Sequence, residues 1–364
     1  MILPNVMPDE LARSLAARIC ILNGVGGLDM LAQDMASLFA PPSALTPPVW
    51  CDMMASANRV TPQAFHAGHT LLPFRRAVRP AADCVPFGLV RDQLEISAHS
   101  AFLDRPAKHP LQLCPECTKE DVNFWGFSYW RRSHQLPGST ICQKHLIGLH
   151  EAHKSNWLTL PHDALNSSTP IDASITTSAK RNPVIQRYTE ISIGLAERTQ
   201  PVSTAWMVHV LKRRFHSHIE ESGHPTRRLT TIAVKMIRGP WQQHFFPELD
   251  ACGTGLNSLD RTCSSIRLAY STPFYALALA VLFEDADDAM NEVTSPAIDT
   301  FVKQSHRTNT SPTSYLGGLP AAARAFFGGA SIAEAARSQG VDASQLEALL
   351  RATAAPLTKL MAPL

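Results

Sequence analysis

The sequence predicts a mainly α-helical protein with a helical N-terminal block, a small Cys₃His zinc ribbon, and C-terminal helical and helix-turn-helix domains. Three observations predict this class. Apolar residues recur at helical spacing in both halves, two short Cys/His motifs lie between them, and a helix-turn-helix pattern stands near the end. The 364 residues are 45% hydrophobic and 18% charged, which is enough for a packed core and excludes a disordered chain.

Composition also limits the partners. The longest clean apolar run, Phe274 to Phe283, is half the length of about 20 residues that a bilayer span needs, so we expect no membrane partner. The N-terminus lacks the basic segment of a signal peptide, and we therefore expect a cytoplasmic protein. A net charge of +2 excludes a generally polybasic chain, so any nucleic-acid contact must come from local patches.

Residues 1–105 form the predicted N-terminal block. Leu11, Leu15, Ile19 and Leu22 recur at helical spacing, and Gly24 suits a left-handed helix cap. We place Pro8, Asp9 and Glu10 in the first turn of that helix, where acids favour the dipole. Further helices are expected at 28–38, at 50–59 and from Pro62 onward. Loops and short strands are expected over 70–113.

Residues 106–152 carry the strongest chemical signal. Cys114-Pro-Glu-Cys117 is followed after 24 residues by Cys142-Gln-Lys-His145. Each motif places two ligands on one tight turn, and together they predict a tetrahedral Cys₃His set for Zn²⁺. Because protein fills every position, we expect a structural ion and no enzyme activity at this site. His134 and His150 are the alternatives to His145, and the other cysteines are expected to act as small apolar residues.

Between the two motifs runs an aromatic and basic segment from Phe124 to Gly138. Its aromatic residues are expected to fill the small core of the ribbon. Arg131 and Arg132 are candidates for contact with DNA phosphates, with a solvated basic pair as the alternative.

Residues 153–200 are expected to form a linker with little regular structure, because Ser, Thr, Asn and Pro are frequent there. Residues 201–300 are expected to form a helical domain with helices at 202–218, 229–246 and 271–284, and with an acidic stretch from 284 to 300. This domain is a candidate for DNA binding because cations cluster in it. The cations are Lys212, Arg213, Arg214, Arg227, Arg228, Lys235 and Arg238.

Residues 301–364 are expected to form a helix-turn-helix-like unit. Ser331 can cap its first helix, Gly340 lies in the turn, and Asp342 can cap the second helix. That second helix would present Gln345 and Arg351 to DNA. Contact with a protein is the alternative, because this helix is poor in basic residues.

Several of these segments together resemble the TniQ/TnsD family of target-selection proteins of Tn7-like transposons. The resemblance rests on the Cys-Pro-x-Cys motif, on Trp130-Arg131 followed by His134-Gln135-Leu136-Pro137-Gly138, and on Cys142-x-x-His145 with Leu149 beyond it. Pro8-Asp9-Glu10-Leu11 with Ser14 and Arg18 resembles the opening helix of the family. His69-Thr70-Leu71-Leu72-Pro73-Phe74 resembles its segment ahead of the zinc site. The match runs over about residues 5–150.

The resemblance implies an adaptor and not a transposase. Such a protein recognises target DNA and recruits an AAA+ ATPase regulator, which brings in the transposase. Its N-terminal and zinc regions would face the ATPase. The family often has Cys-Pro-x-His-Gly where this chain has Cys142-Gln-Lys-His145-Leu, so the turn after the ligands must differ.

Two alternatives remain open. An adaptor of this family can dock on a CRISPR effector complex instead of reading DNA, although no second Cys-x-x-Cys ribbon of the kind some RNA-guided members carry is present. A zinc-finger and helix-turn-helix transcription regulator would share most of the motifs. A hydrolase or nuclease is disfavoured, because no H-E-x-x-H, G-x-S-x-G or phosphate-binding loop motif occurs.

Overall fold

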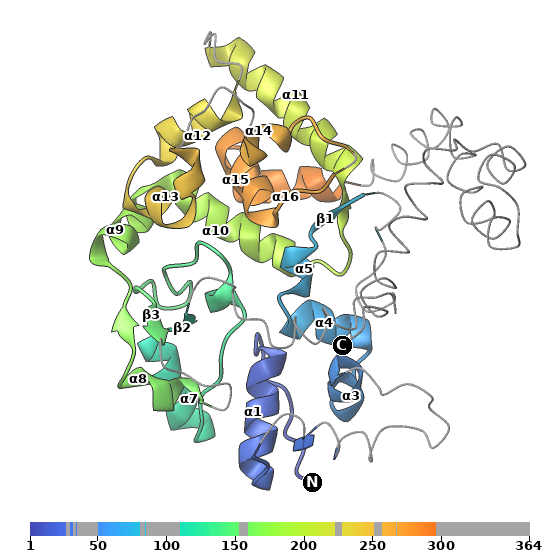
Figure 1. The fold of residues 1–364 in the computed structure, drawn as a ribbon, viewed down its shortest axis with the longest axis vertical. Coiled ribbons are helices and arrows are strands. Elements are labelled where there is room, and N and C mark those ends of the chain that lie inside the picture. Colours follow the sequence, from blue (N-terminus) through green and yellow to red (C-terminus); the bar gives the residue numbers. More distant parts are fainter. Residues whose placement is uncertain are drawn as a thin grey trace, which may run out of the picture. The chain divides into compact units, whose positions relative to one another are not determined.

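The computed structural model describes residues 1–26, 30, 31, 34, 50–80, 84, 110–152, 159–222, 228–250, 257–266 and 268–295. The chain divides into one compact unit at 1–295 and a second at 296–364. The expected helix-turn-helix unit, with Gln345 and Arg351, lies outside the described residues, as does most of the helix expected at 28–38. In the described part the protein is mainly helical, as predicted (Figure 1). No helix in that part is long and apolar enough to cross a bilayer.

Helix α1 (Ala12–Asn23) forms where the apolar spacing predicts it. Leu15 and Ile19 are buried, Leu22 is half exposed, and Gly24 ends the helix at φ 65°. The expectation that Asp9 and Glu10 form its first turn is wrong, because Leu11 is the N-cap. The two acids are instead used in contacts with distant parts of the chain, described below.

The rest of the N-terminal block is a set of short helices. Helices α3 (Trp50–Ala57) and α4 (Pro62–His69) confirm the two expected helices, with the Thr61 hydroxyl capping α4. Met53, Met54 and Phe65 pack with α1 in one apolar core. Helix α5 (Leu72–Arg75) follows and leads into strand β1 (Val78–Arg79), which pairs in parallel with β5 (Val202–Ser203).

A small antiparallel sheet lies beside helix α7 (Pro115–Trp125). Its strand order is β2 (Leu111–Leu113), β3 (His150–Ala152) and β4 (Thr169–Pro170), with Leu113 opposite His150. A 3₁₀ turn, η2 (Ser133–Gln135), stands between α7 and β3. Because β4 comes from residue 169 onward, the sheet is completed by chain beyond the Cys/His motifs.

The prediction of a linker over 153–200 is wrong for the residues that the structure describes. They form α8 (Pro161–Leu165), α9 (Ala173–Arg181) and α10 (Pro183–Ala196). The polar residues that suggested a linker are helix caps: Asp172 accepts from Ser174 N, and Asn182 from Val184 N. Behind those caps Val184, Tyr188 and Leu195 give α10 a buried face.

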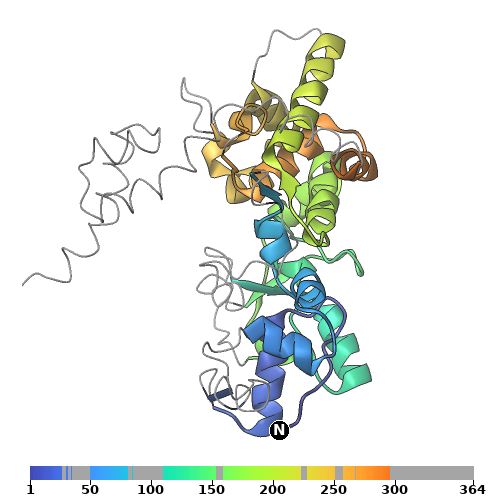
Figure 2. The ribbon, with the colours of Figure 1, turned by 90° about the vertical axis from the view of Figure 1, so that its right-hand side faces the viewer.

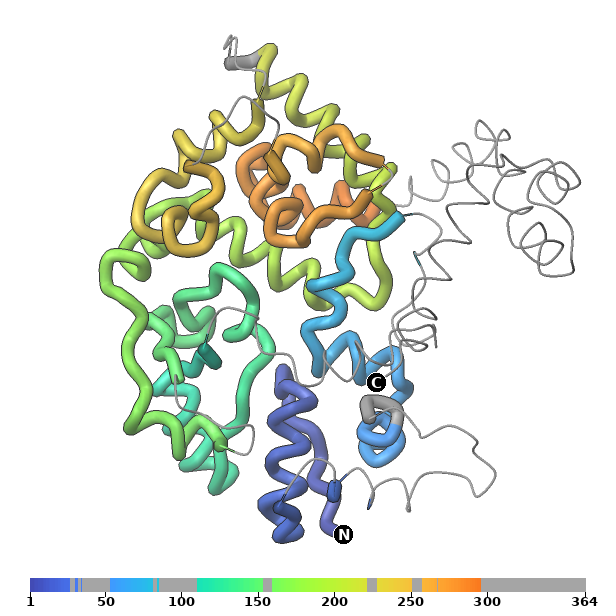
Figure 3. Tube along the Cα trace, viewed as in Figure 1, coloured from blue at the N-terminus to red at the C-terminus, as the bar shows by residue number. Residues whose placement is uncertain are grey.

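The second half packs around one apolar helix. Helix α15 (Thr272–Leu282) is buried along nearly its whole length, and α10, α11 (Thr204–Ser222) and α12 (Leu229–Ile237) pack on it, as Figures 1 and 3 show. The one helix expected at 229–246 is two, α12 and α13 (Pro240–Phe245), because Gly239 at φ 149° and Pro240 break it. The remaining elements are η3 (Pro247–Leu249), α14 (Ser258–Arg261) and α16 (Ala286–Thr294).

Figure 2 shows the two regions of residues 1–295 in side view: the N-terminal helices with the small sheet, and the helices that surround α15. Helix α5 packs on α10, and β1 pairs with β5. The N-terminal block and the second half are therefore held together by direct contacts within one compact unit.

Candidate metal centre

The predicted ligands come together in space. Cys114 directly follows β2 and serves as the N-cap of α7. Cys117 lies in the first turn of that helix, and Cys142 and His145 lie on one turn before β3. All four ligand atoms lie within 4.8 Å of one another, and the three cysteines are buried. The cluster therefore has the donors and the proximity to hold one metal ion.

The distances between the ligand atoms fit tetrahedral coordination of one ion. His145 Nδ1 lies 3.4 Å from Cys114 Sγ, 3.3 Å from Cys117 Sγ and 3.6 Å from Cys142 Sγ. The sulfurs of Cys117 and Cys142 are 3.6 Å apart. Bonds of about 2.3 Å to sulfur and 2.0 Å to nitrogen give tetrahedral edges of roughly 3.8 Å and 3.5 Å. The four atoms therefore lie near the corners of such a site, with Nδ1 of His145 facing its centre.

Local backbone structure explains how these short motifs present their ligands. Pro115 occupies the first position of α7, and the Thr118 hydroxyl donates to the Cys114 carbonyl at 2.9 Å. In the second motif, Cys142 N donates to Ile147 O and Leu146 N to Cys142 O, which closes the turn with Leu146 at φ 55°. The second motif therefore forms the tight turn that the sequence predicts. The first motif does not, because it forms the junction between strand β2 and helix α7.

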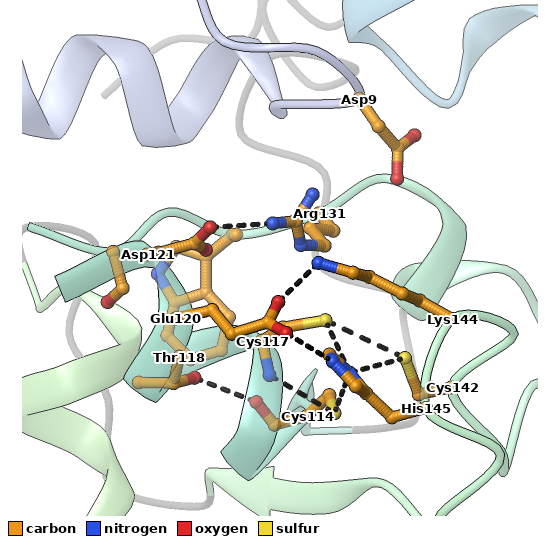
Figure 4. A network of polar contacts seen from close by, with 12 residues as sticks. Asp9, Cys114, Cys117, Thr118, Glu120, Asp121, Arg131, Cys142, Lys144 and His145 are labelled. Carbon is orange, nitrogen blue, oxygen red and sulfur yellow. Dashed lines mark hydrogen bonds and ion pairs between the residues drawn. The ribbon is translucent and has the colours of Figure 1, made fainter. Parts of the chain in front are cut away.

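Glu120 supports the histidine ligand, and sequence reasoning missed it. Its Oε1 lies 3.0 Å from His145 Nε2, so the ring is held by a carboxylate on the side away from the sulfurs (Figure 4). Lys144 pairs with the same carboxylate. Carboxylates commonly orient a metal-binding histidine in this way. A signal was present, because Glu120 follows Cys117 by three residues, which is one turn of the helix.

The thiols perturb one another strongly. Hydrogen bonds from Cys114 and then Cys117 lower the pKa of the Cys142 thiol, and hydrogen bonds to Cys114 and Cys142 raise that of Cys117. One thiolate is therefore favoured at the expense of its neighbours, since several buried negative charges cannot coexist without a cation. A divalent metal would remove this conflict by neutralising the sulfur charges.

The alternative histidines lie outside the ligand set. His150 is in β3 and contacts Ser168 Oγ at 3.2 Å. His134 is buried in η2 and hydrogen-bonds the Cys142 side chain, which contributes to that thiol's lowered pKa after the two cysteines. His145 is therefore the histidine of the cluster.

The side chains of Arg131 and Arg132 are not available for contact with DNA phosphates. The expectation that they are candidates for such contacts is therefore corrected. Arg131 donates to Asp121 at 2.7 Å and stacks on the Tyr129 ring, with its side chain 17% exposed. Arg132 is 8% exposed and donates to Asp9 and to two backbone carbonyls. Both guanidinium groups hold the metal-ligand segment against its surroundings.

The aromatic residues of this segment divide into two groups. Tyr129 and Trp130 are buried, as expected for a small core. Phe124 and Trp125 are not, because their side chains are 76% and 49% exposed at the end of α7, where their rings meet edge to face. The expectation that the whole aromatic cluster fills the core is therefore wrong for these two residues.

The His-Gln-Leu-Pro-Gly stretch acts as a structural connector. Gln135 donates to Gln112 O at 2.7 Å and accepts from Gln112 N at 3.0 Å, which ties η2 to β2. The next turn packs against the second half of the chain. Tyr188 donates to Pro137 O at 2.8 Å, and Trp241 Nε1 donates to Gly138 O at 3.0 Å.

The N-terminal segment is bound to the same region. Leu11 N donates to Trp130 O at 2.9 Å, and Arg132 N donates to Asp9 O at 2.7 Å. Glu10 and Arg18 form a buried ion pair at 2.6 Å beneath these contacts. His69 Nδ1 reaches the Glu10 carbonyl at 2.9 Å, which adds α4 to the assembly.

The DNA-binding candidates of the second half fall into three classes. Arg213 and Arg214 both pair with Glu292 of α16. Lys212, Lys235 and Arg238 are exposed, and Arg228 is half-buried. Arg227 lies outside the described residues, together with Gln345 and Arg351. Among the described candidates, the structure thus brings Arg213 and Arg214 together at Glu292.

In a comparison with known protein families, residues 1–149 match the TniQ family. Residues 1–149 are a TniQ domain. The resemblance drawn from the Cys/His motifs and the two flanking segments is confirmed over this range. The comparison with curated proteins gives no match.

The TniQ domain ends within the structural unit that contains it. Its last residue, Leu149, immediately precedes β3, whereas β4 of the same sheet and helices α8 to α16 come from the following chain. The motifs that carry the resemblance all have a structural role here: they build the metal cluster, hold the N-terminal segment, or dock on α10 and α13. The TniQ domain implies a transposition-associated adaptor role.

Proposed function

We propose that this protein selects target sites for a Tn7-like transposon, by binding target DNA and recruiting an AAA+ ATPase regulator that brings in the transposase. The observation that carries the proposal is the TniQ domain at 1–149, since TniQ-family proteins are adaptors rather than enzymes. The cytoplasm, and the nucleoid when DNA is bound, would be its place of action.

We propose Zn²⁺ as the ion of the Cys₃His cluster, with a structural role. Three thiolates and one imidazole suit zinc, and the four donors complete a tetrahedron. The fold around the cluster consists of short elements, so metal binding would supply much of its folding free energy. The cluster would thereby hold the turn that docks on α10 and α13.

The proposed ATPase-facing surface lies on the TniQ domain. Phe124, Trp125 and Leu146 expose 76%, 49% and 65% of their surface around the metal cluster. Large exposed aromatic side chains are unusual on a surface that meets only water, and they are frequent at protein interfaces. This supports a protein partner for the metal-binding region.

Support for direct DNA binding comes from the second half, where Lys212, Lys235 and Arg238 expose their charges. A CRISPR effector complex that supplies the target specificity is the main alternative. A transcription regulator is the second, and it would bind DNA without an ATPase partner.

Binding of the purified chain to DNA from its transposon's own insertion site tests the proposal. A titration against scrambled DNA at several salt concentrations should show sequence-specific binding. Pull-down of the AAA+ ATPase encoded by the same transposon should also succeed. Sequence-blind DNA binding together with ATPase capture would favour the effector-docked adaptor. DNA binding without ATPase capture would favour the regulator, and failure of both would overturn the adaptor function.

A further inference from the structure

Four exposed cations lie at the ends of two helices. Lys180 and Arg181 occupy the last turn of α9, Lys235 occupies the last turn of α12, and Arg238 is its C-cap. All four side chains are exposed. Lys180 and Arg181 lie in the segment predicted to be a linker and are not among the predicted DNA-binding candidates.

The two helix ends meet. Asn182, directly after Arg181, donates from Nδ2 to the carbonyl oxygen of Met236 at 2.7 Å. An open groove of about 450 Å³ lies at this junction, lined by Ser178, Arg181, Asn182, Pro183, Val184 and Met236. Helix α13, which follows Arg238, packs on α9, and Figure 1 shows α9, α12 and α13 at one end of α10. We call this junction with its four cations the α9–α12 basic surface.

No acidic residue offsets these charges nearby in the sequence. Residues 173–189 and 229–247 contain neither Asp nor Glu. In the part of the chain that the structure describes, no ion pair involves any of the four cations. Arg213 and Arg214, by contrast, share the carboxylate of Glu292, so much of their charge is already compensated.

Helix dipoles explain part of this arrangement. A cation in the last turn of a helix interacts favourably with the negative end of the dipole, by roughly 0.3–1 kcal/mol. That explains a basic residue at each end separately. It does not explain why two such ends converge without an acid, because like charges placed together repel one another. A polyanion on this surface would turn the repulsion into attraction.

The observations favour DNA over an acidic protein as that polyanion. Two of the four cations are arginines, whose planar forks bind phosphate with two parallel hydrogen bonds, and one of these, Arg181, lines the groove. No large exposed apolar side chain of the described part, apart from Met236, accompanies them at this junction. Protein interfaces usually add such residues.

We propose that the α9–α12 basic surface, formed by Lys180, Arg181, Lys235 and Arg238, contacts the phosphate backbone of target DNA. This deepens the proposed function and rests on it. Contacts of this kind position the protein on the duplex and carry no sequence information, so base reading belongs to another part of the chain or to a partner.

The test compares the salt dependence of duplex DNA binding by the full-length chain and its variants. One variant carries Lys180→Gln and Arg181→Gln, a second carries Lys235→Gln and Arg238→Gln, and a third carries all four. Each lost phosphate contact lowers the magnitude of the slope of log K against log salt by about 0.9. Each double variant should therefore lose up to about 1.8 from the slope, and the fourfold variant about twice that.

The control is Arg59→Asn with Lys119→Gln, which removes the same charge from exposed positions on α7 and after α3. Asn suits Arg59 because that residue has φ 57°. The control should keep the wild-type slope. Circular dichroism and bound metal, measured on every variant, show that each is folded.

Four outcomes would overturn the surface. If wild type and all patch variants share one slope, the phosphates are contacted elsewhere, and direct DNA binding itself still stands. If the control changes the slope as much as the patch variants do, only net charge is being measured. If the patch variants keep DNA binding but lose capture of the ATPase, the surface contacts protein. Absence of any DNA binding by wild type would overturn both this surface and the DNA-binding part of the proposed function.

Discussion

Arg132 donates from Nη1 to the carbonyl oxygen of Ala196, the last residue of α10, at 3.1 Å. The same nitrogen donates to Ala67 O of α4, and Nε lies 3.4 Å from the Asp9 carboxylate. One buried guanidinium thus joins the N-terminal segment, α4, the metal-ligand segment and the second half. A cation also suits the carbonyl end of α10, where the helix dipole is negative.

Arg132→Ala should therefore destabilise the whole unit at 1–295. It leaves two buried carbonyl oxygens without their donor, and each such loss costs about 1–3 kcal/mol. We expect the free energy of unfolding, measured in urea, to fall by about 3 kcal/mol. Arg132→Lys should recover only part of it, because an ammonium cannot reproduce the planar fork. Equal stability of Arg132→Ala and the exposed Arg59→Asn would contradict this role.

Loss of a metal ligand should release the ion and unfold its surroundings. Cys114→Ser and Cys142→Ser each remove one of the four donors, and metal binding supplies folding free energy to this region. Native mass spectrometry should show loss of the bound metal ion. Hydrogen exchange should rise over residues 112–150. Retention of one metal ion per chain in both variants would show that the ion is held elsewhere.

Glu120→Gln should weaken the metal site without removing a ligand. The amide cannot hold His145 Nε2 as strongly as the carboxylate does, and loss of such a partner commonly costs 10- to 100-fold in affinity. Competition with a chelator measures this change. Glu116→Gln is the matched control, because Glu116 lies on the same helix and pairs with the exposed Lys119 instead of a metal ligand. Equal metal affinity of the two variants would remove Glu120 from the site.

Gly138→Ala should be more damaging than Gly126→Ala, although both glycines have positive φ. A Cβ at Gly138 would lie 2.5 Å from Tyr188 Cε1, whereas nothing lies within 4 Å of one at Gly126. Both variants carry a backbone cost of about 1 kcal/mol. Only Gly138→Ala must also push back a fully buried Tyr188 ring, so we expect an additional loss of about 1–3 kcal/mol in unfolding free energy. Equal losses would show that the turn at Gly138 does not pack against α10.

The sequence predicts what depends on short spacing. The ligand set needs only two motifs, α1 needs only its apolar stripe and Gly24, and α4 needs only Thr61-Pro62. Each of these features is determined by residues within a few positions of one another. The match of residues 1–149 to TniQ rests on the same local patterns.

What the sequence could not show depends on long-range contacts. Asp9 and Glu10 look like first-turn acids until their partners, Ser133 and Arg18, are known. Arg131 and Arg132 look like phosphate ligands because burial cannot be read from two adjacent arginines. The sequence does not predict the helices between 161 and 196, because Asp172 and Asn182, which cap two of them, are also frequent in linkers.

His66 should make the fold sensitive to mild acid. Burial lowers the pKa of this histidine from 6.5 to about 4, and its Nδ1 has no hydrogen-bond partner among the described residues. Between those two values the unfolded chain binds a proton that the folded chain does not, so stability is present above pH 6.5 and falls as the pH drops toward 4. At about 1.4 kcal/mol per pH unit the full loss is about 3 kcal/mol.

His66→Met tests this effect, because methionine fills a similar volume, adapts its shape and does not titrate. The unfolding free energy of wild type and variant should be measured in urea at several pH values from 7 to 4, with zinc in excess. Protonation of the metal ligands affects both proteins equally, so it cancels in their difference. We expect that difference to shift by about 1–3 kcal/mol in favour of the variant as the pH falls. A difference that is constant with pH would show that His66 is not buried as a neutral group.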